Sequence, residues 1–167
     1  MRRDPRRQPP RDWIESSQEF DGWSSVIKHR NTIEIDAPVS EVFAYVNDPR
    51  TLCEWAISMP ATRSVVGEGE GQQYEWSFKW VGVPLRGQAV IVEYVHNQHA
   101  VHQGIGMFEV LWANFVEPDN RGTKLTMEVE YAIPVPVLGK LAERLLVRRN
   151  ERNLQSALLN LKEKLEG

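Results

Sequence analysis

Carboxylates within apolar runs are the residues of this 167-residue chain best suited to acid–base chemistry. Glu75, Glu93 and Glu109 each stand in such a run, and burial favours the protonated form that a general acid needs. Glu75 has polar neighbours on its own face, so we expect it to face solvent. Glu109 shares its face with apolar residues, and we assign it as the candidate catalytic acid. The sequence leaves open which face of residues 108–117 points inward.

Three histidines, His96, His99 and His102, come nearest to a metal-ligand set. On a strand, residues three apart point to opposite faces, so only His96 and His99, on either side of a two-residue turn, could converge. We therefore expect a surface turn, no metal site and no cofactor. The single cysteine, Cys53, excludes an internal disulfide and a cysteine-based zinc cluster, and it favours a reducing compartment.

Basic side chains concentrate near the C-terminus, where Lys140 is followed by Arg144, Arg148, Arg149 and Arg152. The ordinary interpretation is a solvated helix face. The alternative is a peripheral contact with anionic lipid head groups or with an acidic carrier protein. The net charge of −3 argues against a dedicated nucleic-acid-binding protein.

The composition is that of one globular domain, with 41% hydrophobic and 26% charged residues. We predict a disordered basic tail over residues 1–12, an extension that packs on the domain over residues 13–25, and a single domain over residues 26–167. No hydrophobic signal region and no apolar run long enough to cross a bilayer is present, so we expect a cytoplasmic protein. Monomer and homodimer both remain open.

The pattern along the chain predicts a strand, two short helices, six strands and a long helix. The strand covers residues 26–35, and prolines open helices at Pro38 and at Pro49, the second with Asp48 as its cap. Alternating residues separated by turn signals then predict antiparallel strands over residues 62–67, 72–81, 85–95, 100–106, 108–117 and 124–133. Residues 140–166 contain no proline or glycine and predict the long helix.

The alternation within the predicted strands indicates one apolar and one solvated face for each of them. Tyr74, Trp76, Phe78 and Trp80 share a face of one strand, and Leu125, Met127, Val129 and Tyr131 share a face of another. On the long helix, one stripe carries Val147, Leu154, Leu158, Leu161 and Leu165, whereas Leu138, Leu141 and Leu145 lie nearly opposite. We expect the stripe to pack on the sheet, Glu143 and Asn150 to face a pocket, and the three earlier leucines to close its mouth or meet a partner.

A motif near the first strand resembles a known family. Within residues 33–49, Asp36-Ala37-Pro38 precedes Val42 and Phe43, and the pair Asp48-Pro49 follows. Trp55 comes shortly afterwards. With the element order, this resembles the polyketide cyclase/dehydrase group of the START-like helix-grip (SRPBCC) superfamily, and it is similar to the coenzyme-Q-binding branch. The resemblance implies an α+β helix-grip fold, in which a curved antiparallel sheet wraps around the C-terminal helix. It also implies a cavity for an apolar or aromatic molecule.

We therefore predict a protein that binds or transports a small hydrophobic or aromatic molecule, such as a lipid, a quinone or a polyketide-like compound. The predicted ligand-binding residues are Trp55, Trp76, Phe78, Trp80, Tyr94, Trp112, Met127, Tyr131, Asn150 and Leu154. Among them, Asn150 and Tyr94 would orient the ligand by hydrogen bonds. One alternative is a polyketide cyclase, aromatase or dehydratase that uses an inward acid such as Glu109. A further alternative is a module that interacts with a protein or a membrane.

Overall fold

The structure, a computed structural model, describes residues 26–59, 61–80, 83–106, 109–132 and 140–167. The elements are β1 Val26–Ile35, α2 Val39–Asn47, α3 Leu52–Trp55, β2 Ala61–Val66, β3 Gln73–Trp80, β4 Val83–Val95, β5 His99–Gly106, β6 Val110–Asp119, β7 Gly122–Ala132 and α4 Lys140–Glu166. This is the order that the sequence predicts. The predicted basic tail and N-terminal extension, residues 1–25, lie outside the described residues.

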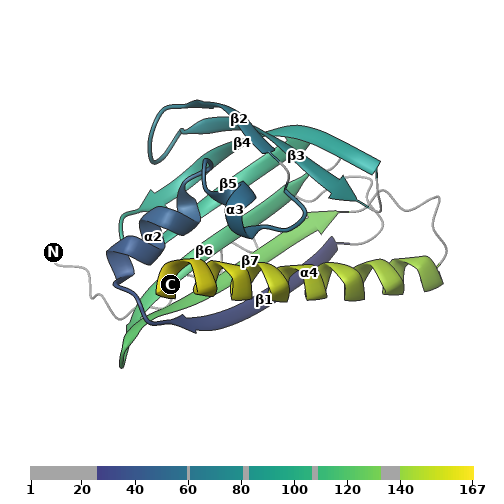
Figure 1. The fold of residues 1–167 in the computed structure, drawn as a ribbon. Helices are drawn as coiled ribbons and strands as arrows, with labels where there is room; N and C mark the ends of the chain where they lie inside the picture. Colours follow the sequence, from purple (N-terminus) through teal and green to yellow (C-terminus); the bar gives the residue numbers. More distant parts are fainter. Residues whose placement is uncertain (1–25, 60, 81–82, 107–108, 133–139) are drawn as a thin grey trace, which may run out of the picture.

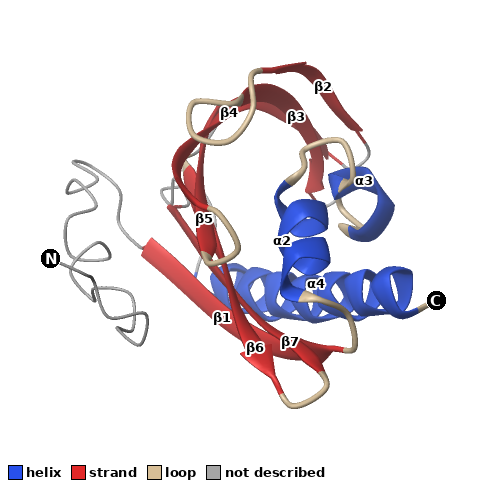
Figure 2. Ribbon diagram, turned by 90° about the vertical axis from the view of Figure 1, so that its left-hand side faces the viewer, coloured by secondary structure: helices blue, strands red, loops and turns tan. Residues whose placement is uncertain are grey.

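The seven strands form one antiparallel sheet in the order β1-β7-β6-β5-β4-β3-β2. Register shifts interrupt the β2–β3 pairing between Arg63 and Val66 and the β4–β5 pairing between Ile91 and Glu93. Irregularities of this kind bend strands and increase their twist. The sheet is strongly curved, and α2, α3 and α4 all lie inside the curve (Figures 1 and 2). The predicted α+β helix-grip fold is confirmed.

The first short helix, α2, begins directly after Pro38, as the sequence predicts. The carbonyl oxygen of Pro38 accepts hydrogen bonds from the amides of Glu41 and Val42, at 3.0 Å each. Proline suits this place because its fixed φ is compatible with a helix start and it lacks the amide proton that would otherwise be unpaired. Phe43 and Val46 are buried beneath the helix, so α2 contributes one side of the core.

The second short helix, α3, is shorter than the predicted helix over residues 49–55. The carboxylate of Asp48 accepts a hydrogen bond from the amide of Arg50 at 2.9 Å. The hydroxyl of Thr51 donates to the carbonyl oxygen of Tyr45 at 2.6 Å. Because these bonds tie the residues after Asp48 back to the end of α2, they form a turn, and the helix starts only after Thr51.

Alternation sorts the side chains of each strand onto the concave and the convex face. On β3, Tyr74 and Trp76 are buried and Phe78 is half-buried, all on the concave side, whereas Glu75 and Lys79 are exposed. The concave side of β7 carries Leu125, Met127, Val129 and Tyr131. The predicted division into an apolar and a solvated face is therefore confirmed.

The Trp76 ring extends from β3 toward β4 and β5, where glycines stand at the facing positions. A Cβ atom at Gly87 of β4 would clash with the Trp76 indole and with the backbone oxygen of Ile105. A Cβ atom at Gly104 of β5 would lie 2.6 Å from the side chain of Val110. The indole nitrogen donates to the carbonyl oxygen of Gln88 at 3.0 Å. The glycines thus make room for a large aromatic ring at the centre of the concave face.

The predicted apolar stripe of α4 packs on the sheet. Leu158 and Leu161 are buried, and Val147, Leu154 and Leu165 are half-buried. At the C-terminal end, the Glu166 carboxylate accepts a hydrogen bond from the amide of Asp36 at 2.7 Å, and Lys162 donates to the carbonyl oxygen of Glu34. Leu138 and the side chains of Glu143, Leu141 and Leu145 lie outside the described residues.

Replacing Gly87 by alanine tests whether glycine at this position is needed to make room for the Trp76 ring. We expect Gly87→Ala to lower the free energy of unfolding by about 1–3 kcal/mol, because the new methyl group overlaps both a ring and a backbone oxygen. Urea unfolding followed by circular dichroism measures the change. Gln88→Ala is the matched control, since the Gln88 side chain is exposed and the substitution keeps the carbonyl oxygen that bonds to Trp76. Equal stability of the two variants would contradict the prediction.

Candidate functional site

Most predicted ligand-binding residues converge between the concave face and α4. On the sheet, the buried residues are Trp76, Trp112, Met127 and Tyr131, and the half-buried ones are Phe78 and Tyr94. On the helices, Asn150 and Leu154 of α4 are half-buried, and Trp55 of α3 is buried. The Trp80 side chain lies outside the described residues. Glu109 is exposed and directly precedes β6. The structure thus gathers the aromatic and amide residues but leaves the candidate acid on the surface.

Two apolar clusters hold the described helices to the sheet. The larger contains Phe43 of α2 and Leu158 and Leu161 of α4, together with Trp76 and Trp112. The smaller consists of Ile27 and Tyr131, against which Val110, Val129 and Val147 pack. Val110 and Val129 touch both clusters.

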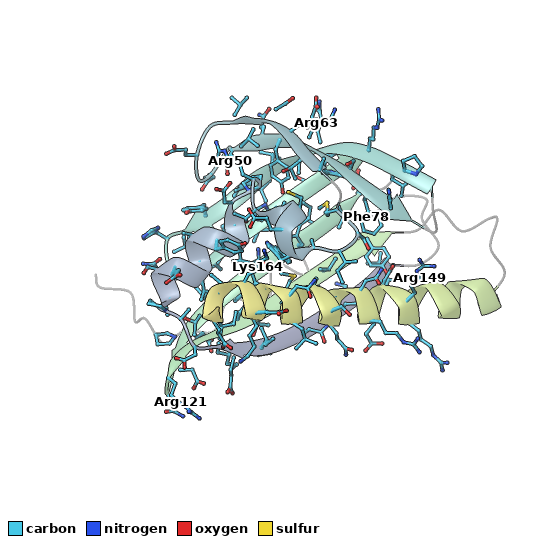
Figure 3. The ribbon with its side chains drawn as sticks, viewed as in Figure 1. Arg50, Arg63, Phe78, Arg121, Arg149 and Lys164 are labelled. Carbon is cyan, nitrogen blue, oxygen red and sulfur yellow. The ribbon has the colours of Figure 1, made fainter. Side chains whose placement is uncertain are left out.

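Several apolar side chains beside these clusters are only half-buried. Four of them are Phe78 of β3, Val110 of β6, Val129 of β7 and Leu154 of α4, and we call these four the half-buried wall. Figure 3 shows Phe78 in the region between β3 and α4. Apolar surface that is left uncovered at the contact between a sheet and its helix can be covered by a bound apolar molecule.

A buried chain of hydrogen bonds, the core network, runs through the larger cluster. The Tyr74 hydroxyl and His102 Nδ1 are 3.1 Å apart, and His102 Nε2 and Asn47 Oδ1 are 3.2 Å apart. Asn114 Nδ2 donates to the same Asn47 oxygen at 2.9 Å, and Asn47 Nδ2 donates to the carbonyl oxygen of Phe43 at 2.9 Å. The network therefore joins the end of α2 to β3, β5 and β6.

The network fixes the proton positions on His102. The Asn47 side-chain oxygen can only accept, so His102 Nε2 carries the proton and Nδ1 accepts the hydrogen bond from the Tyr74 hydroxyl. Burial lowers the pKa of His102 to about 3 and raises the pKa of the Tyr74 phenol. Both side chains are therefore neutral at pH 7, and the network is structural rather than acid–base machinery.

The network also supports an aromatic wall. The Trp112 indole stacks on the His102 ring, with centroids 4.9 Å apart and planes 14° from parallel. Tyr74 meets Trp112 edge to face at 6.4 Å. The Asn114 side-chain oxygen is buried and has no hydrogen-bond partner in the described part of the chain. An acceptor in that state offers a place for a water molecule or for a ligand donor.

A second set of polar side chains, the Tyr131 group, lies against α4 at Asn150, in the N-terminal half of that helix. Asn150 Nδ2 donates to the Tyr131 hydroxyl oxygen at 2.7 Å, and His29 Nε2 is 3.3 Å from the same oxygen. Burial raises the pKa of Tyr131, and the bond from Asn150 opposes this shift. Burial lowers the pKa of His29, and the Glu151 carboxylate opposes that shift. The group thus presents a neutral phenol and a neutral imidazole beside Val129 of the wall.

One buried donor near α3 lacks a partner. Trp55 is 4% exposed, and its indole nitrogen makes no hydrogen bond within the described residues. The Trp55 carbonyl oxygen accepts a bond from Asn160 of α4 at 3.3 Å, which fixes α3 on that helix. A buried N–H without an acceptor costs free energy, so it marks a second position where a ligand oxygen could bind.

The three neighbouring histidines do not meet. His99 is paired with Glu93, with 2.8 Å between Nε2 and Oε1, and His96 is exposed, with its ring edge-on to Phe43. The expected surface turn is present at residues 96–98, and His102, on the strand that follows, faces the core. Across the described ranges, no three His, Cys, Asp or Glu side chains are close enough to hold a metal ion.

The convex side of β1, β7 and β6 carries a pocket of about 220 Å³ that lies away from α4. Leu111 and Ala113 form its apolar floor. Its charged walls pair with each other: Lys28 with Glu130 at 3.0 Å and Arg30 with Glu128 at 3.3 Å. His29 and Val129 also border this pocket, but most of its lining residues lie on the convex face, so we do not include it in the candidate site.

Sequence reasoning missed four polar residues of these two groups: Asn47 at the end of α2, and His29, His102 and Asn114 on the concave face. A signal was present for two of them. His102 alternates with Ala100 and Gly104, and Asn114 stands between Trp112 and Val116, so both occupy inward positions of their strands. A polar residue at an inward position indicates a hydrogen-bonded group or a site.

A curved antiparallel sheet around a C-terminal helix, with apolar and amide side chains between them, defines a helix-grip protein. The chain belongs to the family described as polyketide cyclase/dehydrase and lipid transport, whose model matches residues 26–166. This confirms the family resemblance seen in the sequence. No match was found among the curated proteins. No helix in the described part of the chain is long and apolar enough to cross a membrane.

Solved structures share the fold at low sequence identity. TTHA0849 from Thermus thermophilus has a TM-score of 0.72 and 19% identity, covering 84% of this chain and 97% of its own. A START superfamily protein from Mycobacterium smegmatis has a TM-score of 0.66 and 17% identity, covering 83% and 98%. The Zhui aromatase/cyclase from a Streptomyces species has a TM-score of 0.68 and 12% identity, covering 85% and 94%. At these identities the likeness establishes the fold alone.

The core network predicts that stability falls in acid. The pKa of His102 is about 3 in the folded protein and about 6.5 when unfolded, so between these values the unfolded chain binds more protons. The free energy of unfolding should therefore decrease as pH falls below 6.5, by up to about 1.4 kcal/mol per pH unit from this group. Urea unfolding at pH 7.5, 6.0 and 4.5 measures the slope.

His102→Gln separates this effect from other titrations. Glutamine does not titrate, so the variant should lose stability at pH 7.5 but show a shallower decrease from pH 7.5 to 4.5. His29→Gln is the control, because its imidazole is only half-buried and its lowered pKa contributes less. Parallel pH profiles for wild type and His102→Gln would show that His102 does not cause the acid sensitivity.

Proposed function

We propose that the protein binds a small hydrophobic or aromatic molecule between the concave face and α4. The observation that carries this proposal is the half-buried wall, which leaves apolar surface from three strands and α4 beside two otherwise buried clusters. Covering about 200 Å² of apolar ligand surface would contribute roughly 5 kcal/mol before the costs of association. The family description, which includes lipid transport, supports the same function.

The predicted ligand-binding residues take distinct parts in this proposal. Trp76 and Trp112 would provide flat aromatic surface, and Phe78 and Leu154 would contact the ligand from opposite sides. Met127 would add an adaptable apolar contact. The donors near the ligand would be the Tyr131 group and the Trp55 indole nitrogen. Trp80 and Tyr94 stay predictions as further contacts.

A tryptophan at position 154 should block the proposed site. The larger ring would occupy the space beside Phe78 and Val129, so we expect Leu154→Trp to weaken binding of the neutral fluorescent probe N-phenyl-1-naphthylamine at least tenfold. Leu159→Trp is the matched control, because Leu159 lies on the same helix but is 62% exposed. Fluorescence titration gives the affinities, and thermal melting checks folding.

Two results would contradict the proposal. Absence of probe binding to the wild type, together with no apolar compound in an extract of freshly purified protein, would remove the ligand-binding function. Equal binding by wild type, Leu154→Trp and Leu159→Trp would show that the probe binds elsewhere.

Turnover of a polyketide-like substrate is a second candidate function. The family description and the likeness to an aromatase/cyclase favour it. The exposed position of Glu109 does not support the predicted inward acid, so that assignment stays a prediction. The phenol of Tyr131 is an inward proton donor that such a reaction could use instead.

An anionic membrane surface is the partner that we propose for the basic side of α4. Arg148, Arg149 and Arg152 are exposed. Ile57, which is 61% exposed, precedes Ser58, whose hydroxyl accepts a hydrogen bond from Asn153 of the same helix at 3.3 Å. Exposed arginines and an exposed apolar residue joined to the same helix suit the interface of a bilayer that contains acidic lipids. The Arg144 side chain lies outside the described residues.

Charge reversal tests this partner. We expect Arg149→Glu combined with Arg152→Glu to reduce sedimentation with phosphatidylcholine/phosphatidylglycerol vesicles at least fivefold, because each basic group contributes to attraction near the surface. Arg121→Glu is the control: Figure 3 shows Arg121 at the far end of the molecule from Arg149, in the β6–β7 turn. No sedimentation of the wild type, or the same loss with Arg121→Glu, would exclude this docking surface and leave a protein partner or solvent as the explanation.

A further inference from the structure

The Tyr131 group has more hydrogen-bonding capacity than its own bonds use when His29 Nε2 carries its proton. The phenol oxygen accepts from Asn150 at 2.7 Å, and it has a second lone pair that His29 Nε2, 3.3 Å away, reaches when that nitrogen carries the proton. In that arrangement the Tyr131 phenol oxygen accepts both hydrogen bonds. The phenol proton is then unused and can be donated to a third atom.

The surroundings favour a neutral phenol that donates strongly. Tyr131 is 7% exposed and belongs to the smaller apolar cluster, where an ionised phenolate would be poorly solvated. A hydroxyl that accepts bonds from N–H groups becomes a better donor itself, because hydrogen bonds in a chain polarise one another. Glu151, whose carboxylate acts on His29, disfavours a negatively charged ligand at this place.

We infer that Tyr131, positioned by Asn150 and His29, donates a hydrogen bond to a neutral acceptor oxygen of the ligand, such as the carbonyl of an aromatic ketone or quinone. This inference rests on the proposed function and specifies the ligand chemistry at one end of the site. No proton leaves Tyr131: His29 keeps its own, and the phenol proton is shared with the ligand oxygen. The Val129 and Val110 side chains next to Tyr131 would contact the apolar rings.

A matched pair of probes isolates the carbonyl. Fluorene and 9-fluorenone have the same three-ring skeleton, and only 9-fluorenone carries a carbonyl oxygen. A carbonyl that enters an apolar site without a donor loses its hydration, whereas a carbonyl that meets a donor regains a bond. Wild-type protein should therefore bind 9-fluorenone about twofold to tenfold more tightly than fluorene. Displacement of N-phenyl-1-naphthylamine gives both affinities.

Tyr131→Phe should abolish or reverse this preference and leave fluorene binding within twofold of wild type. The infrared carbonyl band of bound 9-fluorenone should lie at lower frequency in wild type than in Tyr131→Phe, since a hydrogen bond weakens the C=O bond. Tyr45→Phe is the matched control: it removes a phenol oxygen whose proton is donated to Glu54 at 2.8 Å and which belongs to no proposed ligand contact, so it should keep the preference. If Tyr131→Phe does not fold, Asn150→Leu is the second variant, and its preference should fall below that of wild type.

The outcomes separate this inference from the function on which it rests. If neither compound displaces the probe from wild type, the proposed function fails and the inference fails with it. If both bind with equal affinity to wild type, the site exists but has no carbonyl donor, and the inference alone is overturned. It is also overturned if Tyr131→Phe keeps the preference while Trp55→Phe loses it, because the buried indole N–H would then be the donor.

Discussion

The packing of α4 against the concave face of the sheet is the contact on which the rest of the structure depends. Seven strands spaced about 4.8 Å apart make a sheet roughly 30 Å wide, whereas a helix with its side chains is about 10–12 Å across. One helix therefore cannot cover this face. α2, α3 and the large rings of Trp76 and Trp112 cover part of the remainder, and the half-buried wall belongs to the part that they leave.

The core network shows how one side of this face is kept rigid. Burying Tyr74, His102, Asn47 and Asn114 is costly unless their polar atoms are paired, and the described structure pairs all of these atoms except the Asn114 oxygen. Because Asn47 holds the last turn of α2 and bonds to two strands, the helix cannot shift without breaking several bonds together. Because the Trp112 ring stacks on His102, the same network also holds this ring in place.

Much of the fold could be predicted from the sequence because alternation and turn residues act locally. The bounds of β1 and the apolar stripe of α4 were both predicted. Partners in the site could not be predicted in the same way. His102 lies opposite Trp112 in the β5–β6 register, and Asn47 reaches His102 from a helix 55 residues earlier in the chain. Such pairings depend on strand register and helix docking, which no local pattern encodes.

The two polar groups differ in how completely their bonds are used, and this difference separates structure from function. In the core network, His102 has both ring nitrogens paired and is 1% exposed, so it has no capacity left for a ligand. In the Tyr131 group, His29 and Asn150 are only half-buried, and the phenol can donate once its oxygen has accepted. Tyr131 and Asn150 were each predicted as ligand contacts, but only packing brings them together and adds His29. A fold that left Tyr131 fully paired would bind apolar molecules without regard to their oxygen atoms.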